Sequence, residues 1–383
     1  MSEGSSDPHA FIEVRNPVSV RADRLPVERV PIGIPGDYKP SIALLADREL
    51  LLTAFHQVKL GDGKIREDML LVRSRDGGRT WSDRAVTGLV GREPYFSVAR
   101  DGTLFITAHL LAPDVRNARG YIHSYLHRST DGGRTWSTRP IAREDVPGSD
   151  QAEWILTSRN VLELADGTLI LGVSAPGGSD WLWRSTDGAE TWDTSLRCAF
   201  EGVDPSRLSW PFMAETVFWQ ACGGDLLALF RVDPRVFPMP GSDPPGGDQG
   251  GWYRFERLVL FRSGDGGSRW TREPEIGSFY GEMYPAILRL ADGRLLLTFT
   301  VRDLRPPLGV QAVLGIETPD GFAFAFDRDR FVIDAKTPLD RESGGGFGPT
   351  LQLADGTLVT AYSWMGGDGV DRAEVARWRI PPA

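Results

Sequence analysis

A phrase of two apolar runs joined by a short polar turn recurs six times along the 383 residues of this chain. The copies read SIALLADRELLLTAF, YFSVARDGTLFITAH, NVLELADGTLILGVS, TVFWQACGGDLLALF, AILRLADGRLLLTFT and TLQLADGTLVTAYSW. Neighbouring copies lie about 60 residues apart, and the turn aspartates are Asp47, Asp101, Asp166, Asp225, Asp292 and Asp355. Because Gly accepts the positive φ of tight turns, Asp-Gly between apolar runs predicts a β-hairpin.

A second phrase, S-x-D-G-G-x-T-W, follows four of the hairpins as SRDGGRTW, STDGGRTW, STDGAETW and SGDGGSRW. Its aspartates are Asp76, Asp131, Asp187 and Asp265. A carboxylate in such a turn can accept hydrogen bonds from its own backbone N–H groups, so we interpret these residues as structural rather than catalytic. The two phrases together suit one four-stranded sheet per repeat. The sequence therefore predicts an all-β, six-bladed β-propeller with residues 1–383 as a single domain.

The two ends of the chain are predicted to meet. The sixth repeat ends in AEVARWRI and leaves no room for a fourth strand, whereas FIEVRNPVSV, Phe11–Val20, precedes the first hairpin. We expect this N-terminal strand to complete the last blade, which would remove an exposed sheet edge. The Pro- and Gly-rich stretch 237–252 has repeats on both sides and is predicted to be a long loop in the fourth repeat.

Composition and charge narrow the functional classes. A net charge of -9 argues against nucleic-acid binding, which needs a basic surface. No apolar run approaches the roughly 20 residues of a membrane helix, and no signal peptide is visible. A cytoplasmic location is therefore expected, or a secreted one if a leader has been removed. No metal site and no cofactor are expected, because HExxH and close Asp/His clusters are missing from the sequence.

The D-G-G turns resemble the Asp boxes, or BNR repeats, of the sialidase (neuraminidase) superfamily, and the resemblance covers nearly the whole chain. It implies an exo-acting glycoside hydrolase with a carbohydrate substrate. The substrate would be an acidic sugar if arginines bind its carboxylate. Members of this family use three arginines for that carboxylate, an Asp as acid/base, and a Tyr nucleophile activated by a Glu.

Strand geometry predicts where a pocket would lie. The first two strands of a blade are antiparallel, so the start of one and the end of the other open on the same face of the propeller. Buried charges are costly without partners, so ionisable groups gathered there indicate a polar substrate, or else a channel lining whose members pair with one another. The predicted substrate-binding residues are Lys39, His56, Glu93, His109, Arg159, Arg231, Glu282, Arg302 and Trp364.

The fourth repeat carries the closest match to the family's site. WPFMAETVFWQACGGDLLALFR resembles a Glu-strand-turn-strand-Arg arrangement, which implies that Glu215 is the catalytic base and Arg231 a carboxylate ligand. A Glu among arginines stays ionised, as a base must. The alternative is a structural salt bridge between these two residues.

Other positions depart from the family pattern. Lys39 stands where the first Arg is expected, and Lys cannot grip a carboxylate with two prongs. Phe347 stands where the nucleophilic Tyr is expected, which leaves Tyr280 or Tyr284 to take over. The acid is expected in HQVKLGDGKIREDMLL, where Asp62 is preferred to Asp68, although either could be a plain turn residue.

Two other functions remain open. A His such as His56 or His109 could abstract the proton α to a uronic carboxylate, which is the start of a lyase reaction. The second alternative is a non-catalytic propeller that binds a glycan or a protein. Glu215 with Glu93 and Glu282 favours catalysis, whereas the missing Arg and Tyr favour binding alone.

Overall fold

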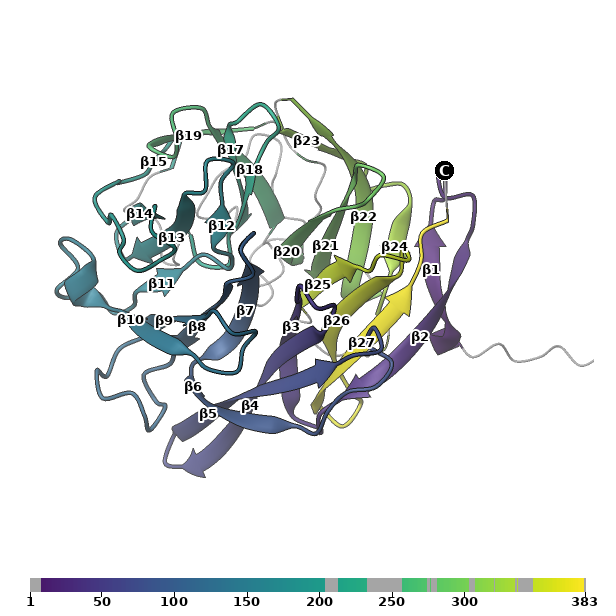
Figure 1. The fold of residues 1–383 in the computed structure, drawn as a ribbon, viewed down its shortest axis with the longest axis horizontal. Helices are drawn as coiled ribbons and strands as arrows, with labels where there is room; N and C mark the ends of the chain where they lie inside the picture. The colour runs from purple at the N-terminus through teal and green to yellow at the C-terminus, as the bar shows by residue number, and fades with distance from the viewer. Residues whose placement is uncertain are drawn as a thin grey trace, which may run out of the picture.

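The computed structural model describes residues 8–203, 213–232, 257–273, 276, 281–302, 307–319, 321–334, 336 and 347–381. Over this part of the chain the structure is all β, with two short 3-10 helices, η1 (Pro8–Ala10) and η2 (Arg143–Asp145), and no α-helix. The sheets stand around a common centre, with β3, β7, β20 and β25 nearest to it (Figure 1). No helix of the described residues has the length and apolar character to cross a membrane.

The first three repeats each form an antiparallel sheet. The strands of the first are β3 (Asp37–Leu44), β4 (Leu50–Gly61), β5 (Lys64–Ser74) and β6 (Ala85–Val90). Those of the second are β7 (Arg92–Val98), β8 (Leu104–Leu110), β9 (His123–Ser129) and β10 (Ser137–Ile141). Those of the third are β11 (Leu156–Thr157), β12 (Leu162–Glu163), β13 (Leu169–Ala175) and β14 (Ser179–Ser185).

The remaining repeats follow the same plan with additions. The fourth sheet holds β15 (Ala199–Phe200), β16 (Val217–Gln220), β17 (Leu226–Val232), β18 (Arg257–Ser263) and β19 (Arg269–Arg272), with β15 parallel to β19. The fifth repeat has β20 (Glu282–Arg289), β21 (Arg294–Val301), β22 (Gly309–Thr318), β23 (Gly321–Phe324) and β24 (Arg330–Val332). The sixth has β25 (Phe347–Gln352), β26 (Leu358–Met365) and β27 (Asp371–Trp378).

The N-terminal strands join the last two repeats. β2 (Arg24–Ile32) pairs antiparallel with β27, and β1 (Phe11–Arg15) pairs with β2 and with β24. The strand beside β27 is therefore not the predicted Phe11–Val20. Pro26 and Pro31 lie within β2, and prolines argue against a strand when a sequence is read alone.

In the first repeat, the S-x-D-G-G-x-T-W phrase forms a self-contained turn. Asp76 accepts hydrogen bonds from the backbone N–H groups of Arg79 (3.0 Å) and Thr80 (2.9 Å) and from the hydroxyl of Ser74 (2.8 Å). The indole of Trp81 donates back to the carbonyl of Gly78 at 3.1 Å. These bonds satisfy the turn internally, in agreement with a structural role.

Candidate active site

Five non-glycine residues at the starts of inner strands have a left-handed backbone: Lys39, Glu93, Glu215, Tyr284 and Phe347, with φ between 51° and 63°. Beside four of them the strand register shifts, as in a β-bulge. A bulge re-aims a side chain, and a left-handed non-glycine residue costs about 1–3 kcal/mol, so such residues gather at functional sites. Here the side chains are linked to one another by ion pairs and ring contacts.

A chain of buried ion pairs connects four consecutive repeats. Glu93 binds the ammonium of Lys39 and, at 3.1 Å, Nη2 of Arg159. The same Arg159 nitrogen lies 3.1 Å from Oε1 of Glu215, whose Oε2 binds Arg231. All five side chains are at most 10% exposed. The Glu215–Arg231 salt bridge anticipated from the sequence is therefore one link of a longer chain, which we call the central cluster.

Two aromatic rings from the fifth and sixth repeats contact the central cluster. The rings of Tyr284 and Phe347 meet edge to face, with centroids 5.1 Å apart. Nζ of Lys39 lies 5.2 Å from the Tyr284 centroid, and Cζ of Arg159 lies 4.1 Å from the Phe347 centroid. These distances are typical of cation–π interactions, which stabilise a positive charge that is removed from water. The hydroxyl of Tyr284 accepts a hydrogen bond from Nη1 of Arg302 at 3.1 Å.

Burial and charge set the protonation states of this site. Burial lowers the pKa of Lys39 to about 8, although Glu93 opposes the shift. Burial alone would raise the pKa of Glu93, but the charges of Lys39 and Arg159 hold it well below its usual value. Burial, with the charge of Glu215, raises the pKa of Tyr284 to about 12. At neutral pH the cluster thus holds an ammonium, a Glu93 carboxylate and a neutral phenol.

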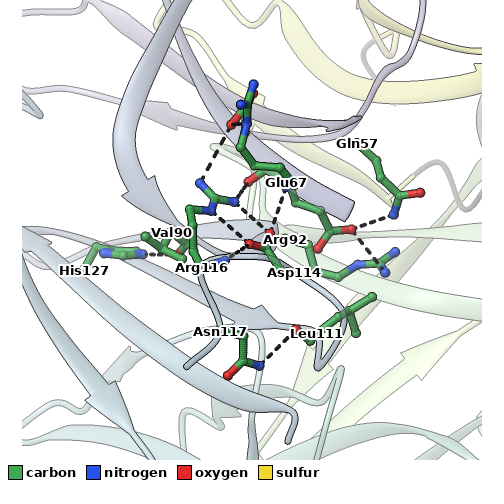
Figure 2. A network of polar contacts seen from close by, with 11 residues as sticks. Gln57, Glu67, Val90, Arg92, Leu111, Asp114, Arg116, Asn117 and His127 are labelled. Carbon is green, nitrogen blue, oxygen red and sulfur yellow. Dashed lines mark hydrogen bonds and ion pairs between the residues drawn. The ribbon is translucent and has the colours of Figure 1, made fainter. Parts of the chain in front are cut away.

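Arg92 ties the central cluster to a second polar network, and sequence reasoning missed it. Its Nη2 lies 3.5 Å from Oε1 of Glu93. Its Nη1 lies 3.4 Å from Oε1 of buried Glu67, a contact that Figure 2 shows. Glu67 accepts a bond from the Gln57 amide at 2.8 Å, and its backbone N–H donates to Asp114 at 2.9 Å. The available signal was the place of Arg92 beside Glu93 at the start of an inner strand.

Two further ionisable groups lie within the electrostatic reach of the cluster. His109 is paired with Arg92 across β7 and β8, and burial lowers its pKa to about 3. Burial raises the pKa of Asp371 to about 6, against the charges of Lys39 and Arg302. His109 is therefore a neutral and weak base at physiological pH.

The structure places three predicted site residues in other contacts. Nδ1 of His56 is hydrogen-bonded to Oδ1 of Asp37 at 2.8 Å. Glu282 is fully buried and pairs with Arg330 at 2.6 Å. Trp364 lies under Nζ of Lys336, 4.9 Å from the ring centroid. The bulges explain part of this, because a one-residue shift changes the direction of every neighbouring side chain.

Asp62 stands apart from the central cluster. Gly61 pairs with Lys64, so Asp62 and Gly63 form a two-residue hairpin turn with φ of 48° and 72°. Asp62 is exposed at the tip of this β4–β5 hairpin, which projects outward from the ring (Figure 1). The other candidate acid, Asp68, is bound by Arg66 at 2.9 Å. Tyr280 lies outside the described residues.

The described residues hold no group of three or more His, Cys, Asp or Glu side chains that could bind a metal ion. No protein-family model matches the chain, and no curated protein sequence is detectably similar to it.

Solved structures do match the chain. A protein of unknown function from Dyadobacter fermentans aligns with a TM-score of 0.68 and 20% identity over 93% of this chain and 99% of its own. The intramolecular trans-sialidase of Ruminococcus gnavus aligns at 0.60 and 12%, over 90% and 94%. The NanB sialidase of Streptococcus pneumoniae aligns at 0.59 and 10%, over 90% and 68%. The predicted sialidase-like propeller fold is thereby confirmed over most of the chain.

Proposed function

We propose that this chain is an exo-acting glycoside hydrolase of the sialidase-like kind, acting on an acidic sugar at the central cluster. The observation that carries the proposal is the buried chain Glu93–Arg159–Glu215–Arg231 against the ring of Tyr284. Charges are costly to bury, and carboxylates beside a phenol are groups that glycoside hydrolysis uses. The Ruminococcus gnavus structure contains oseltamivir carboxylate, an acidic ligand, on the same fold.

The cations of the cluster suit a substrate carboxylate. Lys39, Arg159 and Arg231 come from three different repeats and converge on the ring of Tyr284. A guanidinium group offers a planar pair of donors that matches a carboxylate, whereas an ammonium acts as a point charge. Lys39 in place of an Arg therefore supports a substrate preference that differs from that of typical sialidases.

Contacts within the cluster support roles for the remaining residues. We assign Tyr284 as the nucleophile, because Phe347 has no hydroxyl, and Glu215 as the base that receives the phenolic proton. Arg231 contacts both residues, and Arg302 donates a hydrogen bond to the phenolic oxygen, which would stabilise the phenolate that forms. Asp62 has no part in this proposal, because it occupies an exposed turn.

We also propose that residues 1–383 form one domain of six blades, closed where β2 pairs with β27. The antiparallel register from Val27 with Trp378 to Ile32 with Ala373 supports this closure.

The test is sugar release from a panel of aryl glycosides of N-acetylneuraminic, glucuronic and galacturonic acids and of the matching neutral sugars. We expect release from an acidic member, lowered about 10²- to 10⁴-fold in Glu215→Gln. Glu144→Gln, a surface carboxylate paired with Arg119, is the matched control and should keep wild-type rates.

Two results would contradict the proposal. An unsaturated, ultraviolet-absorbing product would select the lyase reading, which the low pKa of His109 disfavours. Binding of a glycan by folded protein, with no product from any substrate, would select the non-catalytic reading.

A further inference from the structure

A buried serine connects the third repeat to the segment that carries Glu215. Ser174, near the end of β13, is fully buried, and its hydroxyl donates to the carboxylate of Asp180. The same oxygen accepts a hydrogen bond from the backbone N–H of Met213 at 2.9 Å. Asp180 lies directly opposite Ser174 in the β13–β14 pair and is 2% exposed. The hydroxyl proton is thus committed to Asp180, which leaves a lone pair for Met213.

The bond to Met213 fixes the backbone on one side of Glu215. The carbonyl of Met213 accepts the N–H of Thr216 at 3.2 Å, so the two bonds enclose the turn that contains Glu215. On the other side, the carbonyl of Thr216 accepts the N–H of Arg159 at 2.9 Å. Glu215 itself has a φ of 63°, a conformation that a non-glycine residue keeps only where its surroundings impose it.

The same device appears at another strained position of the central cluster. The hydroxyl of Ser363, near the end of β26, accepts the backbone N–H of Lys39 at 3.1 Å. Ser363 is 1% exposed, and Lys39 has a φ of 51°. In both places a buried serine late in the second strand of one repeat holds the start of the next repeat's inner strand.

We infer that Ser174, anchored by Asp180, is a positioning residue that holds the Glu215 carboxylate between Arg159 and Arg231. The inference rests on the proposed function for its consequence in catalysis, whereas its backbone consequence stands independently. Asp180 needs to offer an acceptor oxygen rather than a charge, since burial raises its pKa to about 7. Asn at this position would keep that oxygen, and Leu would remove it.

The experiment compares Ser174→Ala, Asp180→Leu and Asp180→Asn with Ser129→Ala. Ser129 is a matched control, because its buried hydroxyl also donates to an aspartate, Asp131, and accepts a backbone N–H, that of Gly133, but in a surface turn. Two quantities are measured: the hydrogen-exchange rate of the Met213 amide, and kcat and KM on the acidic glycoside that wild type hydrolyses best.

We expect faster exchange at Met213 and a kcat about 10- to 100-fold lower in Ser174→Ala and Asp180→Leu, as for a misplaced catalytic group. Asp180→Asn should restore both quantities, and Ser129→Ala should leave both at wild-type values with KM unchanged. Unaltered exchange at Met213 in Ser174→Ala overturns the inference, as does an equal kcat loss in Ser129→Ala. Faster exchange in a chain that hydrolyses nothing supports the positioning contact and counts against the proposed function alone.

Discussion

At the scale of single residues, backbone strain and chemistry coincide. Lys39, Glu93, Glu215 and Tyr284 all combine a left-handed backbone with an ionisable side chain in one buried cluster. Their places in the site could be predicted from strand order, because the inner strands of all repeats surround the centre and begin on the same face of the propeller. Their conformation could not, since no local sequence signal marks a left-handed Lys or Glu.

Lys39 should make substrate binding depend on pH. Its ammonium faces Glu93, Arg92 and Arg302, and burial lowers its pKa to about 8. Protonated below that pH and neutral above it, Lys39 would lose its attraction for a carboxylate as pH rises. We predict that KM for the acidic glycoside increases several-fold between pH 7 and about pH 9.5, while Lys39→Arg, which cannot deprotonate, shows a flat KM. A rise of equal size in both proteins would contradict this role.

At the scale of elements, the hairpins and the D-G-G turns were predictable because both depend on local residues. Placement of individual side chains depends on register, which the sequence does not reveal. Glu282, for example, precedes a register shift between Met283 and Ala286 and pairs with Arg330. Trp364 lies beside Lys336. This contact was not predicted, because no signal in the sequence indicates that Lys336 returns to β26.

The D-G-G turns should support stability without affecting catalysis. Although burial opposes the shift, bonds from Thr80, Ser74 and the backbone hold the pKa of Asp76 far below its usual value. Its stabilisation is therefore complete above about pH 4 and is lost as pH falls. Asp76→Ala should lower the free energy of unfolding by about 1–2 kcal/mol at pH 7. Urea unfolding measures this difference in free energy, with Asp83→Ala, at an exposed position, as the control. A loss of kcat in Asp76→Ala would contradict the structural assignment.

At the scale of the whole molecule, the repeats bring residues far apart in sequence into one site. Repeat number and order were predictable from the recurring hairpins. The position of the N-terminal segment was only partly predictable, because the two prolines in β2 argue against a strand when the sequence is read alone. Its apolar side chains nevertheless belong to the core: Ile12 and Leu25 pack in one cluster with Phe331 and Trp378.

We propose that the sugar binds at the buried central cluster. A crystal structure of Glu215→Gln soaked with the acidic glycoside that wild type hydrolyses best tests this most directly. We predict that the sugar carboxylate lies within hydrogen-bond distance of Arg159 or Arg231 and that the anomeric carbon lies next to the Tyr284 hydroxyl. A sugar bound at the outer rim or between repeats, with the central cluster unchanged, would show that the cluster is not the sugar site.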